Sequence, residues 1–282
     1  MIPYIHIPPL DLGFVKIYAF GVLVGFAILV GFFSTKRRAG KVGLDPEEAH
    51  TMAIWVIAAA FFVAHAEAMI FDYPQQLMEN PWNLLLSLTP ISSMGGFLGA
   101  FIALLVYTKK RGLSFLAYAD VFVWGIVLAW VFGRLGCTLA HDHPGSLSNF
   151  FLAVKYPGGS RHDLGFYEFL YTLLVLYPVT RILGRKPRPN GFFLVIVPLM
   201  YAPIRFVFDF LRSKHYGNVD PRYFALTAAQ WFCMAMVAGG LFALYKMRHA
   251  AQTHGPTQDT PEPQEPQDEH DTEDQDAKDT TG

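Results

Sequence analysis

The sequence predicts an all-α integral membrane protein, and two observations carry that prediction. First, 52% of the 282 residues are hydrophobic and 15% are aromatic, which is unusual for a soluble domain of this length. Second, about seven segments are long and apolar enough to cross roughly 30 Å of hydrocarbon as helices. The first of them has full membrane length and basic residues behind it, so we interpret it as a permanent span and not as a cleaved leader.

The predicted spans follow one another at short intervals. They lie near Val15–Phe33, His50–Phe71, Ile91–Thr108, Leu116–Leu139, Phe166–Leu183, Gly191–Leu211 and Leu226–Met247. Ionisable residues interrupt several of these spans. A charged group in a membrane costs about 2.5 kcal/mol or more, so such residues are either paired or functional.

Loop charges predict the orientation of the spans. The segments after the first, third and fifth spans are rich in Lys and Arg, whereas the loop 72–90 contains neither. Because the excess of basic residues marks the cytoplasmic side, we expect the N-terminus outside and the C-terminus in the cytoplasm.

The chain divides by composition into two parts. Residues 1–248 contain the apolar segments and form the expected membrane-embedded domain. The remainder, 249–282, holds ten acidic residues, one lysine and no aromatic residue, which leaves the body with a formal charge of about +8. A segment of this kind cannot bury enough apolar surface to fold, so we expect a disordered, acidic cytoplasmic tail.

Two arginines are the leading candidates for a functional site. Arg205 shares one helical face with Asp209 and Arg212, and Arg134 lies near the end of the fourth span, fourteen residues after Asp120. Their planar forks of donors suit a phosphate headgroup. The alternative is mutual pairing that only locks the helices together. A transporter is disfavoured, because its polar groups would gather near the bilayer midplane.

Two further patterns bear on the site. Gly95, Gly96 and Gly99 open the third span and allow close approach either of another helix or of an acyl chain. The cluster 141–143 with His162 has the composition of a zinc site, but its spacing matches no helical ligand pair and no cysteine joins it, so we expect no metal.

These residues resemble the prolipoprotein diacylglyceryl transferase family over nearly the whole membrane body. The resemblance rests on an ordered set of motifs, each weak alone. They are Gly95-Gly96, Gly133-Arg134-Leu135-Gly136 with Asp142 and Gly145, Arg161-His162 with Tyr167-Glu168, Tyr201 with Arg205-Phe206, Asp209 and Arg212, and Thr227 with Gln230.

The resemblance implies a reaction and its partners. Members transfer a diacylglyceryl group from phosphatidylglycerol to the lipobox cysteine of prolipoprotein signal peptides. They do so at the outer leaflet of the bacterial cytoplasmic (inner) membrane. The expected partners are therefore phosphatidylglycerol, prolipoproteins and membrane lipids, with no nucleic acid, no metal and no organic cofactor.

The resemblance also assigns roles to single residues. Arg134 and Arg205 would bind the phosphate and stabilise charge on the leaving group, while Asp209 and Asp142 would orient these arginines or the incoming thiol. Substrate-binding roles carry over to Gly95, Gly96, Gly133, Cys137, Gly145, His162 and Arg212.

Three positions depart from the family pattern. Phe20 replaces a tyrosine, Met94 replaces the histidine before Gly-Gly, and Cys137 replaces an asparagine. Two interpretations follow. Either another histidine of the outer loop, His141, His143 or His162, supplies the base, or the chain is a catalytically altered homologue that binds phospholipid or lipoproteins without transferring.

Overall fold

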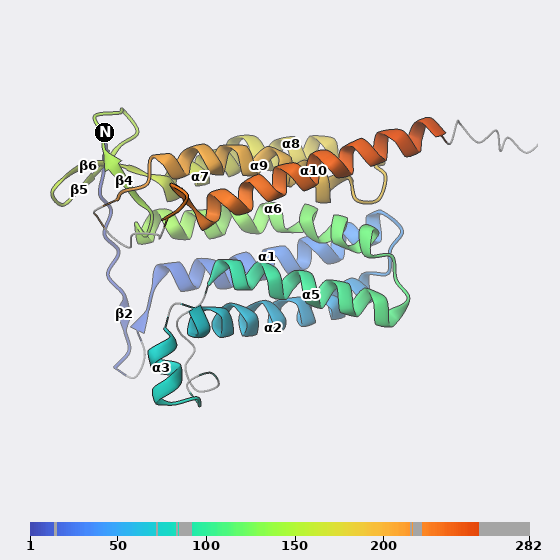
Figure 1. The fold of residues 1–282 in the computed structure, drawn as a ribbon, viewed down its shortest axis with the longest axis horizontal. Helices are drawn as coiled ribbons and strands as arrows, with labels where there is room; N and C mark the ends of the chain where they lie inside the picture. Colours follow the sequence, from blue (N-terminus) through green and yellow to red (C-terminus); the bar gives the residue numbers. More distant parts are fainter. Residues whose placement is uncertain are drawn as a thin grey trace, which may run out of the picture. The chain divides into compact units, whose positions relative to one another are not determined.

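The computed structural model is mostly helical, as the sequence predicts. It describes residues 1–13, 16–71, 73–82, 84, 92–214, 216 and 222–253. Its helices are α1 (Ala19–Lys41), α2 (Pro46–Phe71), α3 (Pro74–Glu79), α5 (Ser93–Arg111), α6 (Phe115–Ala140), α7 (Leu164–Tyr171), α8 (Tyr177–Leu183), α9 (Phe192–Phe210) and α10 (Ala228–Thr253) (Figure 1). Residues 1–244 form one compact unit and the chain from Tyr245 onward another. The expected acidic tail falls almost entirely outside the described residues.

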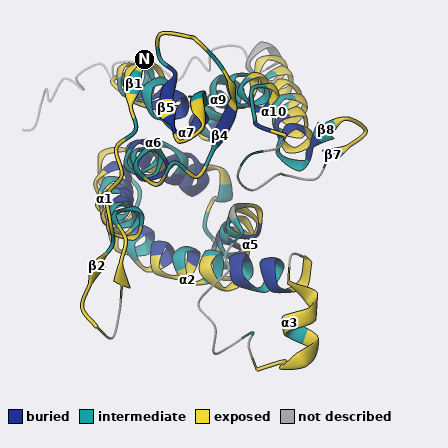
Figure 2. Cartoon of the chain, turned by 90° about the vertical axis from the view of Figure 1, so that its left-hand side faces the viewer, coloured by how far each residue is buried: buried dark blue, intermediate teal, exposed yellow. Residues whose placement is uncertain are grey.

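Six helical segments are long and apolar enough to cross a membrane: α1, α2, α6, α7 to α8, α9 and α10. The third predicted span corresponds to α5, which does not belong to these six. Large apolar side chains point outward from these six segments, such as Phe33, which is 63% exposed, and Leu174, which is 65% exposed. Figure 2 shows such exposed positions along the helices. Surfaces of this kind are stable in lipid and costly in water.

Small residues set how closely the helices pack. α1 lies along α6 and α2 lies along α5. A Cβ atom on Gly31 would lie 3.2 Å from Ala129, and one on Gly95 would lie 2.7 Å from the Val63 carbonyl oxygen. Gly99, four residues after Gly95, faces α2 in the same way. This is the close packing that small residues four apart permit in membranes.

The outer loop corrects the all-α prediction. Strands β1 (Ile2–Pro3), β5 (Val154–Tyr156), β6 (Gly159–Asp163) and β4 (Pro144–Leu147) form a four-stranded sheet in that order. β1 pairs parallel to β5, and the other pairs are antiparallel. Pro157 and Gly158 supply the β5 to β6 turn, where Gly158 has φ 85°. Short strands in a long loop lack the length and alternation that reveal strands in a sequence.

This sheet brings three helix ends together. β4 follows α6 and β6 precedes α7, and the Leu164 amide donates to the His143 carbonyl at 3.1 Å. The end of α9 joins them, since the Ser146 amide donates to the Leu211 carbonyl at 2.7 Å. Arg134, Glu168 and Arg205 are thereby carried on helices whose ends share one support.

The fifth predicted span is continuous but not uniformly α-helical. A π-helical turn, η1 (Thr172–Leu176), connects α7 to α8. Thr172 donates its hydroxyl to the Glu168 carbonyl at 2.6 Å. The turn contains one residue more than an α-helical turn and sits directly beside the buried Glu168, and π turns are frequent at functional sites.

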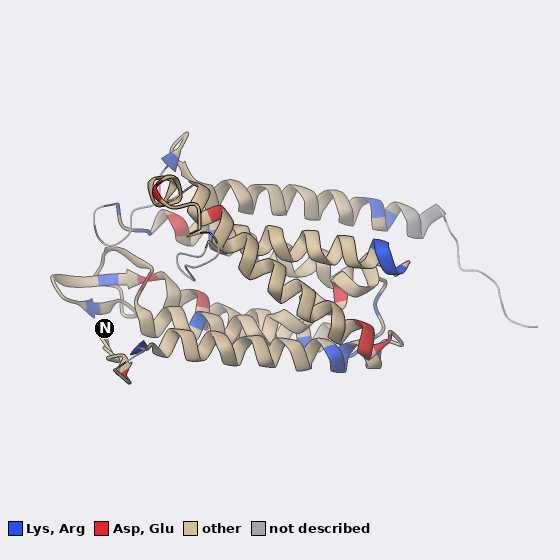
Figure 3. Cartoon of the chain, turned by 90° about the horizontal axis from the view of Figure 1, so that it is seen from below, with Lys and Arg blue, Asp and Glu red and all other residues tan. Residues whose placement is uncertain are grey.

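Two small hairpins complete the described structure. β2 (Leu10–Asp11) pairs with β3 (Lys16–Ile17), and β7 (Arg222–Tyr223) pairs with β8 (Leu226–Thr227) just before α10. Charged residues gather at the helix ends and are sparse in the helix middles (Figure 3). The core of buried apolar residues lies where α1 ends, α2 begins, α5 ends and α6 begins.

Candidate functional site

One buried carboxylate joins the two predicted arginines. Glu168 of α7 contacts Arg134 of α6 through Oε2, with Nη2 at 3.0 Å, and Arg205 of α9 through Oε1, with Nε at 3.2 Å. The Glu168 side chain is 2% exposed, whereas those of Arg134 and Arg205 are 16% and 13% exposed. Both guanidinium groups are therefore held at one point while each keeps some accessible surface.

A second carboxylate fixes Arg205 from its own helix. Asp209 Oδ1 accepts from Arg205 Nη1 at 2.7 Å, one helical turn away. Asp209 Oδ2 accepts from the hydroxyl of Thr227, the residue before α10. Thr227 and Gln230 also bond reciprocally, amide to side chain at 3.0 and 3.2 Å, which is the capping box of α10. The start of α10 thus supports the orientation of Arg205.

A tyrosine and a tryptophan complete the surroundings of Arg134. Arg134 Nη2 donates to the Tyr201 hydroxyl at 2.8 Å, and that hydroxyl donates to Glu168. The Arg134 guanidinium also lies 4.9 Å from the ring centroid of Trp130. These contacts leave its Nη1 directed to Cys137 Sγ, at 3.8 Å.

Cys137, Asp142 and His143 form a small group beside Arg134. One ligand-type atom from each lies within 4.8 Å of the others. The expectation that no cysteine joins the outer-loop histidines is therefore wrong. α6 ends in a left-handed residue, His141 with φ 51°, and this turn folds the following residues back toward Cys137. Arg134 already donates to the sulfur, and its positive charge disfavours a cation, so we assign no metal ligand here.

His143 is the member of this group that suits proton transfer. Its Nδ1 is buried without a hydrogen-bond partner among the described residues, and Nε2 lies 3.8 Å from Asp142 Oδ1. Burial lowers the pKa of His143, Arg134 and Arg212 lower it further, and Asp142 opposes them. The imidazole is therefore neutral near pH 7 and able to accept a proton.

The other two histidines of the loop have structural partners. His141 lies 2.7 Å from Asp163 Oδ2 through Nδ1 and stacks on Tyr4 at 4.1 Å. His162 Nδ1 lies 2.8 Å from the Tyr167 hydroxyl, and burial lowers the pKa of His162. Within the described residues, neither ring forms a hydrogen bond or ion pair with Arg134 or Arg205.

The predicted glycines divide by their surroundings. A Cβ on Gly145 would lie 2.7 Å from His162 Cβ and 2.8 Å from the Leu211 carbonyl oxygen, so Gly145 permits a backbone crossing. Gly95 permits the contact of α5 with α2, whereas a Cβ on Gly96 would meet Ala64 only at 3.8 Å. Gly133 faces open space, which leaves room for a ligand beside Arg134.

The three departures from the family pattern also have positions in the fold. Phe20 of α1 packs against α6, since a Cβ on Gly136 would lie 3.1 Å from its ring. Met94 is 43% exposed at the start of α5. Arg212, predicted to bind substrate, forms a β-bridge with Gly145.

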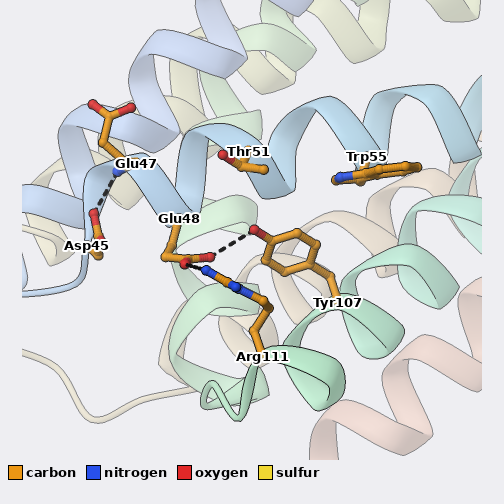
Figure 4. A pocket seen from close by; sticks show the side chains of 7 residues that line it. All are labelled: Asp45, Glu47, Glu48, Thr51, Trp55, Tyr107 and Arg111. Atoms are coloured by element: carbon orange, nitrogen blue, oxygen red, sulfur yellow. Dashed lines mark hydrogen bonds and ion pairs between the residues drawn. The ribbon is translucent and has the colours of Figure 1, made fainter.

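A separate pocket lies at the other ends of α2 and α5 (Figure 4). It measures about 400 Å³ and is lined by Asp45, Glu47, Glu48, Thr51, Trp55, Tyr107 and Arg111. Glu48 accepts from Arg111 and from Tyr107, the latter at 2.8 Å, and Glu47 pairs with Lys36 at 2.8 Å. Its carboxylates are largely neutralised, and it does not adjoin the arginines of the candidate site.

Sequence reasoning named Glu168, Tyr201 and Thr227 among the motifs but assigned no role in the site to any of them. A glutamate within a predicted apolar span was the available signal for Glu168, because an intramembrane carboxylate requires a partner. Tyr201 and Thr227 carry no charge, and only their presence in the ordered motifs marked them. Their roles come from contacts between helices far apart in sequence.

Apolar helices that surround a pair of arginines held by buried carboxylates define a multi-pass membrane protein with a preorganised polar site. The chain belongs to the prolipoprotein diacylglyceryl transferase family, whose model matches residues 9–246.

Curated relatives agree with this assignment over most of their length. The chain is 28% identical to the phosphatidylglycerol–prolipoprotein diacylglyceryl transferase of Shouchella clausii, over 74% of this chain and 82% of the relative. It is 25% identical to that of Chromohalobacter salexigens, over 84% of this chain and 89% of the relative. It is 26% identical to the enzyme of the same name from Pseudomonas fluorescens, over 89% of this chain and 97% of the relative.

Proposed function

We propose that this chain transfers the diacylglyceryl group of phosphatidylglycerol to the thiol of a lipobox cysteine in prolipoproteins. The observation that carries the proposal is the Glu168 carboxylate holding Arg134 and Arg205 together. The family assignment supports the reaction class, and the names of the relatives support both substrates.

The proposed topology has seven spans, with α5 as the additional one. α5 packs along α2, and a GxxxG pair, Gly95 and Gly99, lies at that contact. Basic residues at the ends of α1, α5 and α8 support an N-terminus outside and a C-terminus in the cytoplasm. The site then faces the outer leaflet of the cytoplasmic membrane.

The arginines act on the leaving phosphate. Sulfur forms a bond to the glycerol carbon, the bond from that carbon to the phosphate oxygen breaks, and glycerol phosphate leaves with the electron pair. The phosphate thereby changes from a diester with one negative charge to a monoester with more. Donors that are already oriented by Glu168 and Asp209 stabilise this charge without reorganisation.

His143 accepts the thiol proton in this proposal. Met94 has no basic atom, whereas the unpartnered Nδ1 of a neutral His143 lies in the group beside Arg134. Burial lowers the pKa of His143 most, Arg134 and Arg212 lower it further, and Asp142 and Glu168 raise it. Because the pKa lies below its ordinary value of about 6.5, the base is active at neutral pH and is lost as the pH falls through the lowered pKa.

Transfer to a lipobox peptide in phosphatidylglycerol-containing micelles tests the assignment. Arg134→Gln should lower the rate about 10²-fold or more, and His143→Gln about 10²-fold with loss of the acid limb of the pH profile. The matched control is His6→Gln, at an exposed position. A His143→Gln enzyme with the parent pH profile would remove the base assignment.

One observation favours a second candidate function. The position of the family histidine holds Met94, which is 43% exposed, so the chain could retain the lipid site without the reaction. Expression in cells depleted of their own transferase separates the two: growth supports transfer. Failure to grow, together with binding of phosphatidylglycerol by the purified chain, would support binding without transfer.

A further inference from the structure

Two arginines meet on one tryptophan at the opposite end of the bundle. The guanidinium of Arg181, in α8, lies 3.7 Å from the centroid of Trp124, and that of Arg38, in α1, lies 4.9 Å from it. Arg38 Nη1 donates to the Gly184 carbonyl at 3.0 Å, and Arg181 Nη2 donates to Ser34 Oγ at 3.4 Å. Three helices thus bring two positive charges to a single ring.

The two arginines are only partly balanced by negative charge. Among the residues that the structure describes, neither guanidinium forms an ion pair. The nearby carboxylate of Asp120 accepts from the Phe193 and Leu194 amides, at 2.5 and 3.0 Å, and so caps α9. Cation–π contacts offset part of the repulsion between the arginines. Asp120 also attracts Arg38 electrostatically, and one negative charge against two positive charges leaves the group with a net charge of +1.

An unsatisfied donor lies at the same place. Trp124 Nε1 is buried and has no hydrogen-bond partner among the residues that the structure describes. It faces Gly184, where an added Cβ would lie 2.6 Å away. A buried polar atom without a partner calls for an explanation such as an unseen ion or water. Here that atom belongs to the ring that both guanidinium groups contact.

The surroundings fit a lipid headgroup. Phe33, beside Ser34, is 63% exposed, and Ile182, beside Arg181, is 57% exposed. Basic pockets between transmembrane helices on the cytoplasmic side bind the headgroups of anionic lipids. Apolar side chains next to such a pocket can contact the acyl chains of the same molecule.

We propose that Arg38, Arg181 and Trp124 bind the phosphate of an anionic phospholipid in the cytoplasmic leaflet, at a second site distinct from that of Arg134 and Arg205. Along α7 and α8, Glu168 and Arg181 are thirteen residues apart, roughly 20 Å, so one phosphate cannot occupy both sites. The leaflet follows from the orientation proposed above. The site itself does not depend on transfer activity.

Retention of lipid by the purified full-length chain tests this site, measured by native mass spectrometry with added phosphatidylglycerol or phosphatidylcholine. All proteins compared carry Arg134→Gln as the background, so that the site of Arg134 and Arg205 contributes less to the lipid retained. Adding Arg181→Gln should weaken phosphatidylglycerol retention about tenfold or more, the loss of a charge-assisted contact. Arg185→Gln is the matched control: it removes the same charge from an exposed position and should change nothing.

The other arms discriminate among sources and guard against misfolding. Arg181→Lys should retain intermediate binding. If Arg181→Gln does not fold, Trp124→Phe replaces it as the test variant and should also weaken binding. Equal retention by the Arg181→Gln and background proteins, or an equal loss in Arg185→Gln, overturns the proposal. Equal retention of phosphatidylcholine also overturns it. If inorganic phosphate raises the unfolding temperature as much as phosphatidylglycerol does, the ligand is a soluble anion and the lipid assignment fails.

Discussion

Replacing Glu168 by glutamine tests whether one carboxylate organises the site. Glu168, Arg134, Arg205 and Asp209 together carry no net formal charge, and Glu168→Gln changes that sum to +1. The lost partner is 2% exposed and contacts guanidinium nitrogens at 3.0 and 3.2 Å. Breaking a buried ion pair from one side costs about 3–5 kcal/mol, so we expect a free energy of unfolding lower by about that amount.

Reversible unfolding in detergent measures this loss of stability. A second measurement with added phosphatidylglycerol compares how much the lipid stabilises the variant and the parent. A bound phosphate returns a negative charge to the two arginines, so the lipid should stabilise Glu168→Gln more than the parent. Glu67→Gln is the control, because Glu67 Oε2 is a buried carboxylate oxygen without a hydrogen-bond partner in the described structure. If the Glu168 and Glu67 variants unfold within 0.5 kcal/mol of each other, a scale typical of neutral substitutions, our account of the network is refuted.

Three further substitutions test how the helices are held. Gly95→Ala should lower stability and expression, because its Cβ would lie 2.7 Å from the Val63 carbonyl oxygen, whereas Gly133→Ala, which faces open space, should fold normally. Thr227→Val should cost about 1–2 kcal/mol through loss of the α10 cap and reduce transfer, while Thr227→Ser retains both hydrogen bonds. Asp120→Ala should cost about 1–3 kcal/mol by leaving two buried amides of α9 without an acceptor, as unfolding experiments would show, and Asp120→Asn should cost less.

The helical part of the fold could be predicted because each membrane span requires a long apolar segment, which is visible in the sequence. The sheet could not, since its strands contain two to five residues and pair across a loop and the N-terminus. Val154 illustrates the difficulty: its partner in β1 is Ile2, far away in sequence.

The candidate site was predictable in its charges but not in its connections. Arg134, Arg205 and Asp209 stand out because charged groups are rare in apolar spans. Their pairing through Glu168 depends on how three helices are rotated about their axes, and the sequence does not specify that rotation. The contact of Cys137 with Arg134 is different, because the two residues lie three apart on α6 and helical spacing alone brings them together.

The π-helical turn at Thr172–Leu176 has a consequence for insertions and deletions. It lies between Glu168 and Arg181, so the same helix serves the candidate site and the proposed lipid site. Because the turn holds one residue more than an α-helical turn, deleting one residue there would restore α-helical geometry and keep the two ends close to their present rotation. Deleting one residue from α7 or α8 instead would rotate one end against the other by about 100°, so Glu168 and Arg181 would not both keep their places.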